Sequence, residues 1–145
     1  MSGESAKRAI KLFAEGRNCA QSVYAASGAG SGMTEAQRLA VSAAFGGGMG
    51  RSGATCGALT GALMALGEKY SADLADDPKA ARDQIYADSK ALMEEFRAIF
   101  GSTLCRELTG CQLDTEQGQQ DFAARDVKQN LCMRVVEFAA EKAGE

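Results

Sequence analysis

The chain has 145 residues, enough for one domain that buries about 70% of the surface of its unfolded form. Its formal net charge of -3 and pI near 5.1 argue against a nucleic-acid partner, and no apolar run approaches the ~20 residues of a membrane span. From its length we expect a single domain over residues 1–145. Because the N-terminus lacks the apolar core of a signal peptide, we expect a cytoplasmic protein.

Helix-forming residues dominate the periodic stretches, and proline occurs once. We therefore predict an all-α protein, a compact bundle of about six or seven helices. The segment 113–125 is polar, and its structure is not determined by the pattern. The predicted helices cover residues 4–15, 18–26, 34–45, 56–70 and 77–100, a short turn that carries Cys105, and a last helix from Asp126.

Local capping signals support several of these bounds. Asn18 with Gln21 three residues later is typical of a capping box. Asp77 followed by Pro78 favours the start of the long helix, and Gly101 ends it. The apolar positions of that helix form one stripe, which ends in Ile99 and Phe100.

Two glycine patterns surround residue 56. Residues 48–53 match G-x-G-x-x-G, but a dinucleotide site needs a strand before the motif, and here a helix is predicted. Gly53, Gly57, Gly61 and Ala65 recur every four residues and form a smooth strip on one helix face. Such a strip predicts a close neighbour, which is another helix, a second subunit or a metal cluster. A homo-oligomer is therefore expected.

Cysteine and histidine usage limits the chemistry. The chain has no histidine, which excludes Cys-His and Ser-His nucleophile pairs and a His-ligated haem. Its cysteines include no C-x-x-C pair, so any shared site must be assembled by the tertiary fold. For a single cysteine such as Cys132, apolar filler is the simplest interpretation. The five cysteines are Cys19, Cys56, Cys105, Cys111 and Cys132.

Three of these cysteines share a predicted position in the first turn of a helix. Cys19, Cys56 and Cys105 each follow a predicted helix start. The helix dipole and free N–H groups at such a position stabilise a thiolate, so we expect lowered pKa values there.

The residues Cys56 to Gly61 fit the signature C-G-A-x-x-G, and the sequence resembles the C_GCAxxG_C_C family of redox-active proteins. The resemblance extends over nearly the whole chain and includes the segments 18–23, 45–50 and 101–110. It implies a set of four cysteines, with Cys111 outside it. A similar domain in split-Soret cytochromes carries an iron–sulfur centre. The implied set is Cys19, Cys56, Cys105 and Cys132.

The leading hypothesis is electron transfer or redox sensing through an iron–sulfur cluster, with these four cysteines as the metal and cofactor ligands. The first alternative is metal-free thiol–disulfide chemistry, in which Cys56 and Cys105 are the candidate catalytic thiols and Cys132 or Cys111 could also resolve. A four-cysteine zinc site and a partner-binding helical protein stay open as further alternatives. No hydrolase or transferase signature is present, and the redox partner protein is not identified by the sequence.

Overall fold

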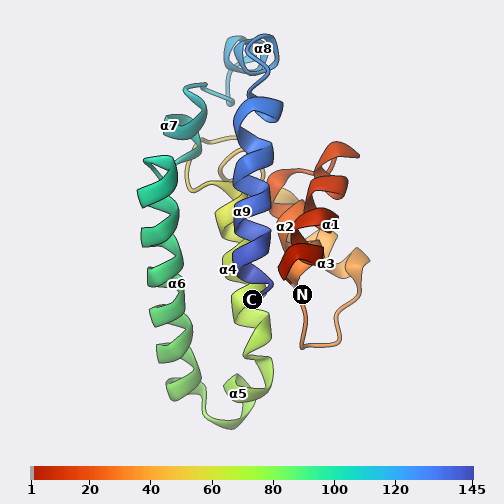
Figure 1. The fold of residues 1–145 in the computed structure, drawn as a ribbon, viewed down its shortest axis with the longest axis vertical. Coiled ribbons are helices and arrows are strands. Elements are labelled where there is room, and N and C mark those ends of the chain that lie inside the picture. The colour runs from red at the N-terminus through yellow and green to blue at the C-terminus, as the bar shows by residue number, and fades with distance from the viewer. Residues whose placement is uncertain (1) are drawn as a thin grey trace.

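The chain forms a bundle of helices, with nine α-helices over residues 2–145, the part that the computed structural model describes (Figure 1). Met1 of the predicted domain lies outside that part. Within it there is no strand, and Thr55 and Leu104 form one isolated antiparallel bridge. The all-α prediction is confirmed. The helices are α1 (Ser2–Ala14), α2 (Cys19–Ser27), α3 (Glu35–Ser42), α4 (Gly57–Lys69), α5 (Ser71–Asp76), α6 (Pro78–Phe100), α7 (Cys105–Thr109), α8 (Glu116–Ala124) and α9 (Met133–Ala143).

The predicted number of six or seven helices is too low, because two short helices carry weak sequence signals. Helix α5 follows α4 directly after Tyr70. Helix α8 lies in the polar segment 113–125, where the Thr115 side chain accepts a hydrogen bond from the Gly118 N–H and caps it. A 3₁₀ turn, η1 (Ala43–Phe45), continues α3, and a π-helical turn, η2 (Lys128–Cys132), leads into α9.

The capping predictions are confirmed. Asn18 and Gln21 form a reciprocal capping box at the start of α2, with both hydrogen bonds present at 2.9 and 3.1 Å. The Asp77 side chain accepts from the Ala80 N–H, and Gly101 ends α6 in the left-handed conformation with φ 89°. These signals succeed because they depend only on neighbours within three or four residues.

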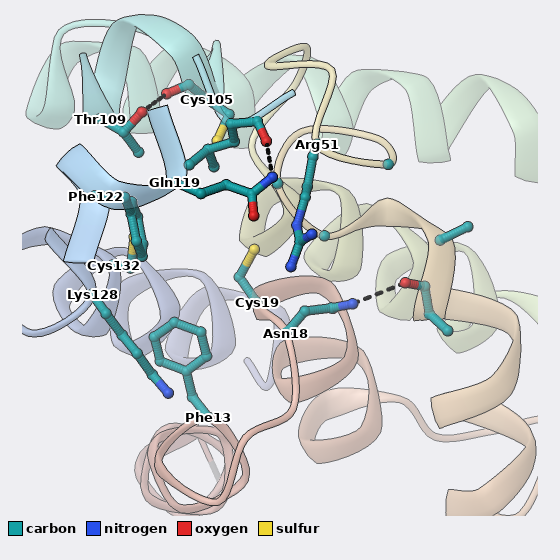
Figure 2. A pocket seen from close by; sticks show the side chains of 16 residues that line it. Phe13, Asn18, Cys19, Arg51, Cys105, Thr109, Gln119, Phe122, Lys128 and Cys132 are labelled. Atoms are coloured by element: carbon teal, nitrogen blue, oxygen red, sulfur yellow. Dashed lines mark hydrogen bonds between the residues drawn. The ribbon is translucent and has the colours of Figure 1, made fainter. Parts of the chain in front are cut away.

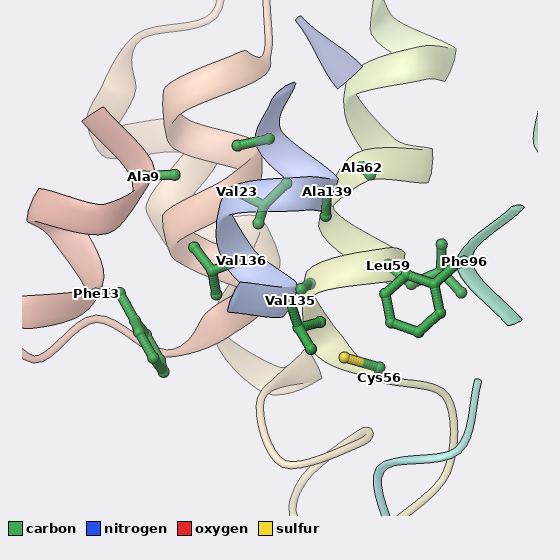
Figure 3. Packing of buried hydrophobic residues seen from close by; sticks show 12 residues of the cluster. Ala9, Phe13, Val23, Cys56, Leu59, Ala62, Phe96, Val135, Val136 and Ala139 are labelled. Carbon is green, nitrogen blue, oxygen red and sulfur yellow. The ribbon is translucent and has the colours of Figure 1, made fainter. Parts of the chain in front are cut away.

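Helices α1, α2, α4 and α9 pack against one another and enclose the main core, which is built largely from alanine and valine (Figure 3). Helix α6 is attached to it through the fully buried Phe96. The Phe96 ring lies 6.1 Å from the ring of Phe138 on α9, and Phe100 lies 5.5 Å from the same ring. Ile99, although part of the predicted stripe, is 53% exposed, since α6 is covered on one narrow face only.

The part of the predicted strip that lies on α4 packs against α2 of the same chain. Gly53 was wrongly included in the strip, because it lies in the loop before α4 with a φ of 78° and faces Arg106. A Cβ atom at Gly61 would lie 2.7 Å from the Ala20 carbonyl oxygen, and one at Gly57 would lie 2.5 Å from Cys19 Sγ. The two helices therefore approach closely because these positions lack side chains. Of the three neighbours predicted for the strip, another helix is the one found, so the strip gives no support to a homodimer face.

A buried polar network joins α2, α3 and α4 at Glu68. Its carboxylate accepts hydrogen bonds from the Tyr24 hydroxyl at 2.7 Å, from Arg38 Nε at 3.0 Å and from the Ser31 hydroxyl at 2.8 Å. The Arg38 guanidinium also contacts the second carboxylate oxygen. These donors hold the pKa of Glu68 at about 2. Burial of the Tyr24 hydroxyl, together with its hydrogen bond to the Glu68 carboxylate, raises the pKa of Tyr24 to about 12.

Candidate cysteine site

Four of the five cysteines line one small cavity of about 30 Å³. Cys19 is the first residue of α2 and Cys56 is the N-cap of α4. Cys105 is the first residue of α7, and Cys132 is the last residue of η2. The fold thus brings together four cysteines that are far apart in the sequence, and they are the four that the sequence singled out. The remaining wall consists of Leu108, Thr109, Leu131 and Val135.

Backbone pairing holds Cys56 and Cys105 side by side. The Cys56 N–H donates to the Thr103 carbonyl at 2.8 Å, and the Cys105 N–H donates to the Ala54 carbonyl at 2.7 Å. These bonds flank the Thr55–Leu104 bridge. Backbone hydrogen bonds therefore fix the start of α4 to the start of α7, and this pairing places the thiols of Cys56 and Cys105 near each other.

Glycines make room for the other contacts around the sulfurs. A Cβ at Gly57 would overlap Cys19 Sγ, and a Cβ at Gly48 would lie 2.7 Å from the Cys105 Cβ. Gly48 has a φ of 70°, which glycine adopts without strain. The glycine-rich loop over residues 46–53 and the first glycine after Cys56 are therefore part of the architecture of the site.

Burial dominates the electrostatics of the thiols. It raises the pKa of Cys19 and Cys56, brings the pKa of Cys105 to about 11 and brings that of Cys132 to about 12. The neighbouring cysteines add to the increase for all except Cys19. The prediction of lowered pKa values was wrong, because loss of hydration outweighs the helix-terminal N–H groups.

Backbone N–H groups near Cys19 act against the effect of burial on its pKa. Backbone N–H groups of Gly47, Ala20 and Ala58 act on Cys19 and lower its pKa against the larger effect of burial. They come from the glycine-rich loop, α2 and α4. Such N–H donors stabilise a thiolate once a positive charge compensates for its burial.

The donor set fits a soft metal in composition, while the sulfurs are spread around the cavity wall. Within residues 2–145 no three Cys, Asp or Glu side chains already stand at the separation needed to hold a metal ion. The cavity of about 30 Å³ has room for about two water-sized atoms, so the thiols have space to turn inward. Four thiols, apolar walls and backbone N–H donors suit a thiolate-ligated centre.

A second cavity of about 710 Å³ opens beside the first, and Cys19, Cys105 and Cys132 border both (Figure 2). Cys56 borders the small cavity only. Sequence analysis missed Gln119, Phe122 and Lys128, which form one wall of the larger cavity. They lie on α8 and η2, where the pattern was weakest. The other residues of its wall are Phe13, Asn18, Ala43, Ala44, Gly46, Gly47, Gly50, Arg51, Thr109 and Leu113.

Cys111 stands apart from this arrangement. It borders neither cavity and is buried beside Cys105, Leu113 and Val127. Arg125 Nη2 donates a hydrogen bond to its sulfur at 2.7 Å. Its separate position agrees with the four-cysteine set implied by the resemblance.

A family model described as "Putative redox-active protein (C_GCAxxG_C_C)" matches residues 17–145. The chain belongs to this family. The matched region of this C_GCAxxG_C_C protein contains all four cavity cysteines as well as Cys111. Searches of curated proteins and of solved structures found no match. None of the helices in residues 2–145 has the length and apolar character needed to cross a membrane.

Proposed function

We propose that this C_GCAxxG_C_C protein acts in electron transfer or redox sensing through an iron–sulfur cluster held by its four cavity cysteines. The observation that carries the proposal is their convergence on one apolar cavity from four helical segments that are far apart in the sequence. The ligands would be Cys19, Cys56, Cys105 and Cys132.

The residues of the site suit this chemistry. A bound cluster supplies one-electron transfer, and four cysteine thiolates are its usual ligands. The N–H groups of Gly47 and Ala58 lower the pKa of Cys19, and N–H groups of this kind would raise the reduction potential of a cluster bound there. The apolar side chains of Leu108, Leu131 and Val135 keep water from one side of the site. All five cysteines are free, and a reducing cytoplasm would keep them available for a metal.

The alternatives have less support. In metal-free thiol–disulfide exchange Cys56 is the attacking thiol, yet it does not border the open cavity, whereas Cys105, which is equally buried at 7% exposure, does. A disulfide substrate would reach Cys105 or Cys132 first. A zinc site uses the same four thiols, and it differs from the proposal in metal content and colour.

Analysis of iron, zinc and acid-labile sulfide in protein purified without oxygen tests the proposal. We expect iron and sulfide in about equal amounts and a charge-transfer absorption that bleaches on reduction. The variant C132A should lose most of the iron, and the matched control C111A should keep it. Colourless, iron-free protein would overturn the proposal, and equal loading of both variants would overturn the assignment of the ligands.

A further inference from the structure

The larger cavity is not accounted for by the four cysteines. Its volume of about 710 Å³ lies within the range of about 300–1,000 Å³ that small-molecule sites occupy. That is far more space than a metal centre between the sulfurs would fill. The wall that it shares with the cysteine site is formed by Cys19, Cys105, Thr109 and Cys132.

The charges on its wall are of one sign. None of the 16 residues that line the cavity is acidic, whereas the whole chain has a net charge of -3. Two cations line it, and neither Arg51 nor Lys128 forms an ion pair with a carboxylate within residues 2–145. Figure 2 shows the Arg51 side chain reaching inward from the glycine-rich loop, with Lys128 across from it. A wall of this kind concentrates anions.

The structure restrains the side chain of Lys128 and the backbone of Arg51, whose side chain is exposed. Arg51 has a φ of 66°, a backbone conformation that the hydrogen bond from its N–H to the Gly46 carbonyl helps to maintain. Lys128 Nζ lies 4.8 Å from the centre of the Phe13 ring, which restrains it by a cation–π contact. Positioned cations bind an anion with less loss of conformational entropy than mobile ones.

The rest of the wall is suited to an apolar body. Phe13, Leu113 and Phe122 line the cavity together with two alanines of the η1 turn. An inorganic oxyanion would leave these apolar surfaces wet, whereas an aromatic or alicyclic ligand would cover them.

We infer that the cavity binds a small organic anion, with its carboxylate, sulfonate or phosphate group attracted by the positive charge that Arg51 and Lys128 give the wall and its apolar body against Phe13 and Phe122. Bound there, the ligand lies against the open side of Cys19, Cys105 and Cys132. Binding requires only the cavity and its charges. A role for the ligand as substrate or regulator of the cysteine centre rests on the proposed function.

A matched pair of fluorescent probes tests the inference on the protein as purified without oxygen. 1-Anilinonaphthalene-8-sulfonate is an organic anion, and N-phenyl-1-naphthylamine has the same ring system without the sulfonate. We expect saturable binding of the anionic probe, at least about tenfold tighter than binding of the neutral one. Equal affinities, or no saturable binding of the sulfonate, would overturn the inference.

Variants then locate the anion. Each of R51N and K128Q should weaken binding of the sulfonate about tenfold and leave the neutral probe unaffected. Asparagine tolerates the left-handed backbone at position 51, and an unchanged melting temperature shows that each variant is folded. The control K90Q removes an exposed lysine of α6 that does not line the cavity, and it should bind as the parent does. A uniform effect of all three variants would point to net charge and overturn the site.

Energy transfer gives the position independently, because the chain has no tryptophan. The variant F122W places a donor in the cavity wall, and Y86W places one on α6 at a side chain that is 65% exposed. Bound sulfonate should quench the first donor strongly and the second weakly. The reverse order would refute the location. Since none of these measurements depends on iron, iron-free protein that binds the probe would refute the proposed function alone.

Discussion

Replacing Glu68 by glutamine should remove a pH-dependent part of the stability of the bundle. The pKa of Glu68 is about 2, against an ordinary value of 4.5, because Arg38, Tyr24 and Ser31 hydrogen-bond to its carboxylate. That separation corresponds to about 3 kcal/mol of stability. The side chain is only 4% exposed, so solvent screens the interaction little. Since the folded-state pKa is depressed, this stability is present above about pH 4.5 and is lost as the pH falls towards 2.

Urea unfolding of the parent and E68Q, followed by far-UV circular dichroism, measures the effect. The difference between their free energies of unfolding should be about 2 kcal/mol smaller at pH 3 than at pH 7. The control E35Q breaks the exposed ion pair of Glu35 with Arg8, whose side chains are 45% and 40% exposed, and should cost less than about 1 kcal/mol. A parent–E68Q difference that stays constant between pH 7 and pH 3 would refute the linkage.

Two further pairs of variants test the packing. G57A should lower the free energy of unfolding by about 1–3 kcal/mol, because its methyl group meets Cys19 Sγ. G67A has open space around it and should raise the free energy of unfolding by the helix propensity gained, about 1 kcal/mol. A G57A protein as stable as the parent would contradict the close approach of α2 and α4. F96A should lower the free energy of unfolding, measured in urea, by about 3–5 kcal/mol, because Phe96 is fully buried. Y86A, at an exposed position, should change it by less than about 0.5 kcal/mol. Similar losses for the two variants would contradict the attachment of α6 to the core through Phe96.

Local signals predicted the fold well where they were strong. The capping box at Asn18 and the Asp77–Pro78 start of α6 depend on near neighbours, so the sequence alone determines them. Helix α8 was missed because its sequence is polar, although Thr115 provides a local N-cap and Gly118 packs against the backbone of Gln112, only six residues earlier. The apolar stripe of α6 was predicted, but the sequence does not show which of its residues the rest of the bundle covers, and Ile99 is left exposed.

The cysteine site was predictable in membership but not in character. The four cysteines were identified through the signature at Cys56, and the structure brings all four to one cavity. The direction in which their pKa values shift was not predictable, because the sequence shows where a helix starts but not how deeply that start is buried. The larger cavity needed tertiary information as well, since Arg51 and Lys128 line one cavity only through long-range packing.

The position of the cysteines at one end of the bundle has a consequence for assembly. Cys56 is the one buried residue of the main core among the proposed ligands, and the remaining core residues and the Glu68 network are packed or hydrogen-bonded without a metal, so the bundle should fold before any centre is built. The open cavity leaves Cys19, Cys105 and Cys132 reachable from outside, which provides a delivery route to the finished protein. Insertion of the metal would then follow folding, whereas a zinc finger folds only as it binds its metal. The same folded chain could therefore lose its metal and bind it again.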